Sequence, residues 1–190
     1  MKDMGNTYFD EALDGFVNIP EGTYPAHLLA LEVIPTKKEG LLRFQSTFKL
    51  AEEVSELIIN KVTKVDAEFI NVLDVDGNEV MINGSTLVGK TVKNNCFVTA
   101  NPIQGEGWRN RKYIDFFTNL GVQFPEVEGK TKVMEIEESD VIGAPTLVTM
   151  NSRQWEGQKG MNISMEVSSN APWADGVRLD PSELDSDIPF

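Results

Sequence analysis

The stretch "LLRFQSTFKL", residues 41–50, alternates apolar and polar side chains, which predicts a half-buried β-strand. Successive side chains of a strand point to opposite faces, so Arg43 and Lys49 should face away from the core. The same alternation recurs in residues 91–100 and 161–167. The side chains expected to point inward are Leu42, Phe44, Ser46, Phe48 and Leu50 in the first stretch, Val92, Cys96, Val98 and Ala100 in the second, and Met161, Ile163, Met165 and Val167 in the third.

Turn signals separate these stretches. Asp76-Gly77 lies between apolar segments and is typical of a hairpin, and "WEGQKGM" offers Gly157 and Gly160 for backbone with positive φ. "PTKKEG" should link a first strand, residues 22–34, to the strand at 41–50. Short strands joined by such turns favour a mainly β protein built as a closed barrel or a sandwich.

Short helices interrupt the β pattern. Tyr113, Phe116, Phe117 and Leu120 recur at helical spacing before Gly121, which predicts a helix with its aromatic face in the core. "ESDVIG" resembles a short capped turn, and the first half of residues 52–69 fits a helix although its β-branched content also fits strands.

Composition excludes several classes of function. Cys96 is the single cysteine and His27 the single histidine, so neither a thiolate cluster for zinc nor a nucleophilic triad is expected, and a structural role is expected for His27. No apolar run reaches the roughly 20 residues of a membrane span, and the N-terminus lacks the pattern of a signal peptide. We expect a soluble, intracellular protein that is not an enzyme and uses no cofactor or metal.

The last part of the chain has a different composition. After Val167 the sequence mixes Ser, Pro, Gly and Asp without periodicity, which predicts a folded domain over residues 1–167 and a disordered acidic tail over 168–190. The tail ends in "DSDIPF", which combines carboxylates with an isoleucine, a proline and a terminal phenylalanine. A partner with an apolar pocket rimmed by Arg or Lys would bind such a peptide, so we expect a docking tip. Its residues are Asp185, Asp187, Ile188, Pro189 and Phe190.

This tip resembles the C-terminal tip of bacterial single-stranded DNA-binding proteins, with Ser186 standing where that family usually has an Asp. The body is similar to phage-encoded single-stranded DNA-binding proteins in "RNRKYIDFFTNLGVQFP" and "VIGAPTLVTM". The resemblance implies an OB-fold, a five-stranded barrel with inserted short helices. It also implies a protein that coats single-stranded DNA during phage replication, recombination or repair in the cytoplasm of an infected bacterial cell. Its tip would recruit replication and repair enzymes, and a homo-oligomer is compatible with this class.

Single-strand binding requires cations for phosphates and aromatic faces for bases. The net charge of −13 opposes it overall, so the cations must form a local patch. Phe97 on a polar strand face is the first stacking candidate, and Trp108 and Trp155 are further ones, although each tryptophan could instead cover the core. The candidate residues are Arg43, Lys49, Lys93, Phe97, Trp108, Arg109, Arg111, Lys112, Arg153, Trp155 and Lys159.

Two other functions compete with DNA binding. The acidic body fits an interaction protein that imitates the tip and captures or inhibits host repair or replication enzymes without binding DNA. The many carboxylates would allow a Mg²⁺-dependent nuclease, but no carboxylate pair shows convergent spacing, so this class ranks last.

Overall fold

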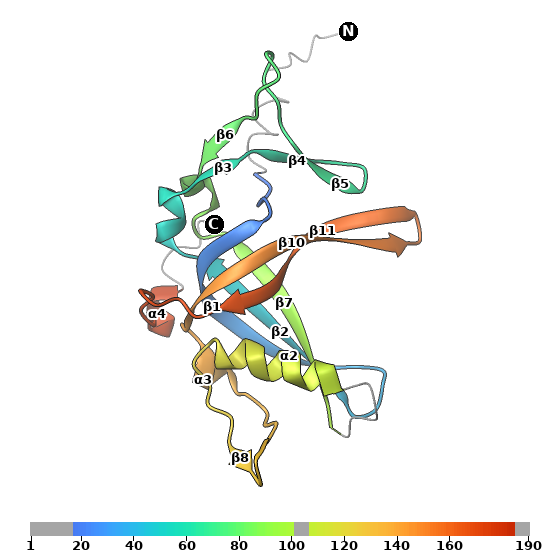
Figure 1. The fold of residues 1–190 in the computed structure, drawn as a ribbon, viewed down its shortest axis with the longest axis vertical. Helices are drawn as coiled ribbons and strands as arrows, with labels where there is room; N and C mark the ends of the chain where they lie inside the picture. The colour runs from blue at the N-terminus through green and yellow to red at the C-terminus, as the bar shows by residue number, and fades with distance from the viewer. Residues whose placement is uncertain (1–16, 101–106, 185–190) are drawn as a thin grey trace.

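The computed structural model describes residues 17–100 and 107–184. Its main element is a five-stranded antiparallel sheet in the order β11-β10-β1-β2-β7 (Figure 1). The mainly β prediction is confirmed, and the long strands coincide with the alternating stretches of the sequence. The five strands are β1 (Gly22–Pro35), β2 (Leu41–Leu50), β7 (Thr91–Thr99), β10 (Pro145–Gly157) and β11 (Gly160–Ala171).

Alternation along β2 produces the expected two faces. Phe44, Ser46, Phe48 and Leu50 are buried, whereas Leu42 is exposed where the strand begins. Toward the end of β7 the predicted alternation is wrong: Thr99, which was not among the inward-facing residues, is buried, and Ala100, which was, is exposed just after the strand. Asn94, which was not among the inward-facing residues predicted for β7, is also buried.

The sheet curls so that its two outer strands, β7 and β11, lie next to each other. Within the described ranges no backbone ladder joins them, and Asn94 Nδ2 bridges the junction by donating to Val167 O at 2.7 Å. A buried amide must find hydrogen-bond partners, so this contact explains why Asn94 lies inside. We call the junction between β7 and β11 the seam.

The helix that the aromatic spacing predicted is α2 (Gly107–Thr118), and it covers one end of the curled sheet (Figure 1). Tyr113, Phe116 and Phe117 are buried, and their rings pack on Phe44 and Phe48 at centroid distances of 4.8–6.2 Å. Edge-to-face and tilted packing of this kind adds about 0.5–1.5 kcal/mol per ring pair beyond area burial. Gly121 has φ +90°, which fits its role after the helix.

Residues between β2 and β7 form an extension beyond the sheet. Its first part is a 3-10 helix, η1 (Glu52–Glu56), and strands follow, so the helical prediction holds for the first turns alone. Gly77 has φ +84° in the turn predicted at Asp76-Gly77. The other elements of the extension are β3 (Ile58–Asn60), β4 (Val62–Val65), β5 (Glu68–Asn71), β6 (Met81–Asn83) and η2 (Gly84–Leu87).

The prediction of a disordered tail from residue 168 is wrong for residues 168–184. Strand β11 continues to Ala171, and Trp173 packs on His27 with ring centroids 5.4 Å apart. Leu179 N donates to Gly143 O, and Leu184 is buried. Polar composition suggested a mobile segment, but the ring of Trp173, the backbone hydrogen bond of Leu179 and the buried side chain of Leu184 hold it to the body. The remaining short elements are β8 (Glu126–Val127), β9 (Lys130–Thr131), α3 (Glu138–Val141) and α4 (Pro181–Leu184).

Candidate nucleic-acid interface

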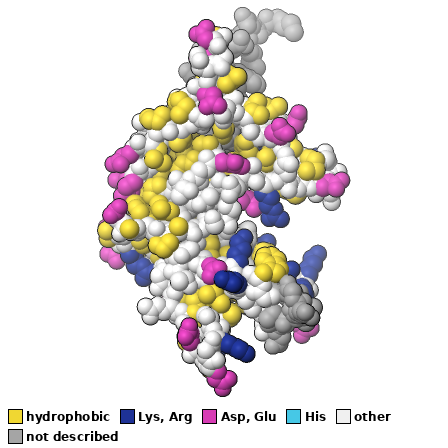
Figure 2. All heavy atoms as spheres, in the orientation of Figure 1, with side chains coloured by type: hydrophobic (Ala, Val, Ile, Leu, Met, Phe, Trp, Pro, Cys, Tyr) yellow, Lys and Arg dark blue, Asp and Glu magenta, His cyan; other side chains and the backbone are white. Residues whose placement is uncertain are grey.

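A cleft with a volume of about 480 Å³ opens along the seam, between the beginning of α2 and the β10–β11 hairpin. Figure 2 shows the molecule hollowed in this region, with Lys and Arg side chains on both sides. We call it the seam cleft. It is lined by Arg43, Asn94, Asn95, Phe97, Trp108, Arg109, Lys112, Asn151, Ser152, Arg153, Glu166, Val167 and Ser168.

The β2–β7 side of the seam cleft carries Arg43 and Phe97. These residues stand directly opposite each other in the ladder, so both side chains lie on the same outer face. Arg43 Nε is buried and has no hydrogen-bond partner among the described residues. A buried charged donor without a partner is costly, and an anionic oxygen entering the cleft would satisfy it.

Asn110 fixes the beginning of α2 against the end of β7. Its Oδ1 accepts from Thr99 N at 2.8 Å and its Nδ2 donates to Thr99 O at 2.9 Å, so one side chain continues the backbone pairing of the strand. Trp108, next to this clasp, is 59% exposed, and the guanidinium of Arg109 lies 5.0 Å from its ring centroid. The two hydrogen bonds between Asn110 and Thr99 therefore hold the exposed indole of Trp108 and the cation of Arg109 beside Phe97.

The charges at the start of α2 oppose the usual preference of helices. A helix N-terminus carries positive partial charge and favours Asp or Glu, yet the first turn of α2 contains no acidic residue and does contain Arg109. Lys112 follows one turn later and also lines the seam cleft. The helix dipole and these two cations produce positive potential in the same place, which would attract an anion.

The β10–β11 hairpin forms the opposite side. Its register places Asn151, Arg153 and Trp155 on one face, and Arg153 Nη1 lies 3.5 Å from Glu166 Oε2. Trp155 is 42% exposed and lies beyond the seam cleft along the hairpin. Both members of the ion pair keep substantial exposure, so Arg153 remains accessible to a ligand.

Three contacts brace this hairpin on its other face. Ser152 N donates to Glu21 Oε1 at 2.9 Å, and hydrogen bonds from Ser152 lower the pKa of Glu21. Gln154 Nε2 donates to Ala67 O at 2.6 Å, and Lys64 Nζ donates to Ile163 O at 3.0 Å. The β4–β5 hairpin thus supports the strand that carries Arg153.

The charge inside the seam cleft is opposite in sign to that of the chain. Its lining contains the cations Arg43, Arg109, Lys112 and Arg153 and one carboxylate, Glu166, whereas the chain has a net charge of −13. Charges that share a partly enclosed cleft interact with a ligand more strongly than the same charges spread over an exposed surface. The arrangement can bind an anion that also presents flat, apolar rings.

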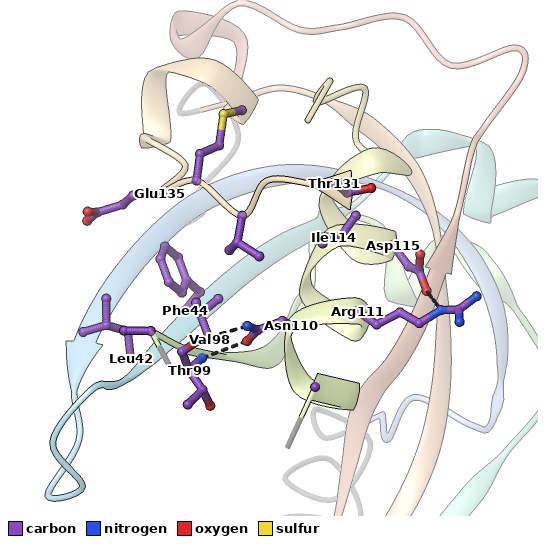
Figure 3. Close-up of a pocket in the computed structure, with 14 residues that line it drawn as sticks. Leu42, Phe44, Val98, Thr99, Asn110, Arg111, Ile114, Asp115, Thr131 and Glu135 are labelled. Atoms are coloured by element: carbon purple, nitrogen blue, oxygen red, sulfur yellow. Dashed lines mark hydrogen bonds and ion pairs between the residues drawn. The ribbon is translucent and has the colours of Figure 1, made fainter. Parts of the chain in front are cut away.

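Six of the predicted residues therefore meet in the seam cleft, and the others lie elsewhere. Arg111 points to the far side of α2, where it pairs with Asp115 at 3.9 Å and lines a different pocket (Figure 3). Lys159 lies in the turn between β10 and β11, and Lys49 and Lys93 lie further along the molecule. The tip residues Asp185, Asp187, Ile188, Pro189 and Phe190 lie outside the described residues.

Sequence reasoning missed the neutral polar lining of the cleft. Asn95 could have been found as the residue between Lys93 and Phe97 on the outer face of β7. Asn151 and Ser168, in contrast, come from strands whose approach to β7 depends on the curl of the sheet. Their side chains hydrogen-bond to each other at 2.6 Å. No local pattern indicates that contact.

Metal-ligating side chains are not grouped in the described ranges. Those ranges contain no cluster of three or more His, Cys, Asp and Glu side chains able to hold a metal ion. Cys96 is buried behind the cleft, its Sγ lies 3.1 Å from Asn94 Oδ1, and burial raises its thiol pKa to about 12. Of the helices between residues 17 and 184, none in the described portion has the length and apolar character needed to cross a bilayer.

Comparison with known proteins gives no family assignment. No protein-family model, curated protein or solved structure matches the chain.

Proposed function

We propose that this protein binds single-stranded DNA without sequence preference and that the seam cleft is the binding site. The observation that carries the proposal is the meeting of four cations and two accessible rings, Phe97 and Trp108, in one cleft of a strongly acidic chain. Single strands expose both a phosphate backbone and the faces of their bases. Cationic grooves with stacking rings bind both features.

The sheet topology supports an OB-fold as the scaffold. An OB-fold is a five-stranded, partly open Greek-key barrel that binds oligonucleotides on the face of its second and third strands and through two of its loops. Strands β1, β2, β7, β10 and β11 would be its five strands, with α2 between the third and the fourth. Arg43 and Phe97 then stand on the expected binding face, and the β10–β11 hairpin is one of the expected binding loops.

A duplex fits the seam cleft less well than a single strand. Duplex bases are stacked on one another and present their edges in the grooves, so Trp108 and Phe97 would have no base faces to stack on. We propose that the protein coats single strands in replication, recombination or repair. Its C-terminal tip would recruit enzymes that act on the same strands.

The test is fluorescence anisotropy with labelled oligothymidylate at low salt. The variant Arg43→Gln/Lys112→Gln should bind at least tenfold more weakly than the wild type, because it removes two charge-assisted phosphate contacts. Lys130→Gln/Lys132→Gln removes the same charge from the β8–β9 hairpin and should bind like the wild type. A wild-type protein that fails to bind would exclude this function and favour the interaction protein that imitates the tip.

A further inference from the structure

The seam cleft continues into a second hollow of about 910 Å³ along the same seam. Both hollows are lined by Asn95 of β7 and Glu166 of β11, so a residue from each side of the seam is common to the two. From there the second hollow extends toward Thr91 on β7 and toward Ser164 on β11. The two hollows therefore form one groove, which we call the seam groove.

Three lysines line the second hollow. Lys49 Nζ donates to Leu184 O at 2.9 Å, Lys90 Nζ donates to Val17 O at 3.1 Å, and Lys93 Nζ donates to Gln45 Oε1 at 3.5 Å. All three acceptors are neutral oxygens. Among the described residues that line either hollow, Glu166 is the one carboxylate, and it already pairs with Arg153. We call this second part of the groove the lysine hollow.

The two parts of the seam groove differ in chemistry. The seam cleft presents the rings of Phe97 and Trp108, whereas the described lining of the lysine hollow contains no aromatic side chain. A ligand that fills both parts must therefore stack at one end and present negative charge at both ends. From Thr91 to Phe97 the groove follows β7 for about 20 Å, at roughly 3.3 Å per residue. A mononucleotide cannot span that length, but an extended polynucleotide strand can.

We propose that one continuous single strand occupies the whole seam groove, with bases stacked in the seam cleft and its backbone following Lys93 and Lys90 through the lysine hollow. This extension rests on the proposed function of the seam cleft. It names the ligand as a strand that runs on past the stacking site, rather than a short oligonucleotide or a strand end. Lys90 then joins the binding residues, although the sequence did not identify it.

The experiment compares a tetramer and a hexadecamer of thymidylate, because single OB-folds cover roughly 4–16 nucleotides. Affinity is measured by anisotropy over a range of salt concentrations for the wild type and for Lys90→Gln/Lys93→Gln. Each phosphate contact to a single strand contributes about 0.7 to the slope of log affinity against log salt. The variant should therefore flatten the hexadecamer slope by about 1.4 and leave the tetramer slope unchanged.

Two further variants keep the result interpretable. Lys93→Gln alone should flatten the hexadecamer slope by about 0.7, and it leaves intact the contact of Lys90 with Val17 that could matter for folding. Lys130→Gln/Lys132→Gln should leave both slopes unchanged. An unchanged hexadecamer slope in folded Lys90→Gln/Lys93→Gln would overturn the extension, while the proposed function would stand as long as the wild type binds both probes. If the wild type binds neither the tetramer nor the hexadecamer, both the extension and the proposed function are overturned.

Discussion

Removing the two rings of the seam cleft should weaken DNA binding with little loss of stability. Trp108 is 59% exposed at the start of α2, so Trp108→Ala removes a ring that contributes little to the core. Phe97 is half-buried on the outer face of β7, and Phe97→Ala leaves the buried Cys96 side of the strand unchanged. Each stacked base contributes about 1–3 kcal/mol, so each substitution should weaken binding by roughly 5- to 150-fold.

The loss of binding free energy in the double variant shows whether Phe97 and Trp108 stack on different bases or on the same base. If they hold different bases, the two losses add and Phe97→Ala/Trp108→Ala should bind more weakly by roughly 2–6 kcal/mol. If both rings contact one base, the double variant should lose less than the sum of the single losses. The assay is anisotropy with oligothymidylate at low salt, supported by thermal melting to verify folding.

Phe69→Ala is the matched control, since Phe69 is a half-buried ring on β5 that lines a different pocket. It should bind DNA like the wild type. The reasoning is refuted if the folded double variant binds within twofold of the wild type, or if Phe69→Ala weakens binding as much as Trp108→Ala does.

Three other predictions concern the tip, one buried histidine and one glycine. Deleting residues 188–190 should abolish recruitment of enzymes in a pull-down while DNA affinity stays equal, because the deletion removes the apolar part of the tip and no charged side chain; a fall in affinity would contradict this. Burial lowers the pKa of His27, which faces Trp173, Glu53 and Lys49. Because the folded pKa lies below the unfolded value, the contribution of His27 to stability is present above about pH 6.5 and is lost as the pH falls. Thermal melting between pH 7 and 5 should show a steeper decline for the wild type than for His27→Gln, and parallel declines would argue against it. Gly143 has φ +74°, and an added Cβ would collide with the Leu179 carbonyl, whereas a Cβ added at Gly121, with φ +90°, would meet open space. Gly143→Ala should therefore lower the free energy of unfolding by about 1–3 kcal/mol more than Gly121→Ala does. Equal losses would contradict the contact.

Local patterns predicted the strands and α2 because those elements follow from side-chain period. Phe44 and Phe48 alternate with polar residues, and Tyr113, Phe116 and Phe117 recur at helical spacing. A short stretch of sequence is therefore enough to identify the side chains of each element that face the core. The same alternation identified Phe97 and Arg43 as outward-facing. Sequence could therefore supply one side of the candidate site.

The opposite side of the site depends on long-range geometry. Glu166 and Asn151 line the seam cleft because the sheet curls and brings β11 beside β7, and no neighbouring residue in the chain encodes that approach. Lys49 was predicted to act with Arg43, but it lies at the other end of β2 and contacts Leu184. Residues 168–184 also read as mobile, since isolated anchors such as Trp173 produce no periodic signal.

Photo-crosslinking tests the central claim most directly. Oligothymidylate that carries 5-iododeoxyuridine is irradiated in complex with the full chain, and the modified residues are identified by mass spectrometry. The account predicts crosslinks at Phe97 or Trp108, the rings of the seam cleft. Crosslinks confined to rings outside the seam groove, such as Phe69 or Phe124, would contradict it.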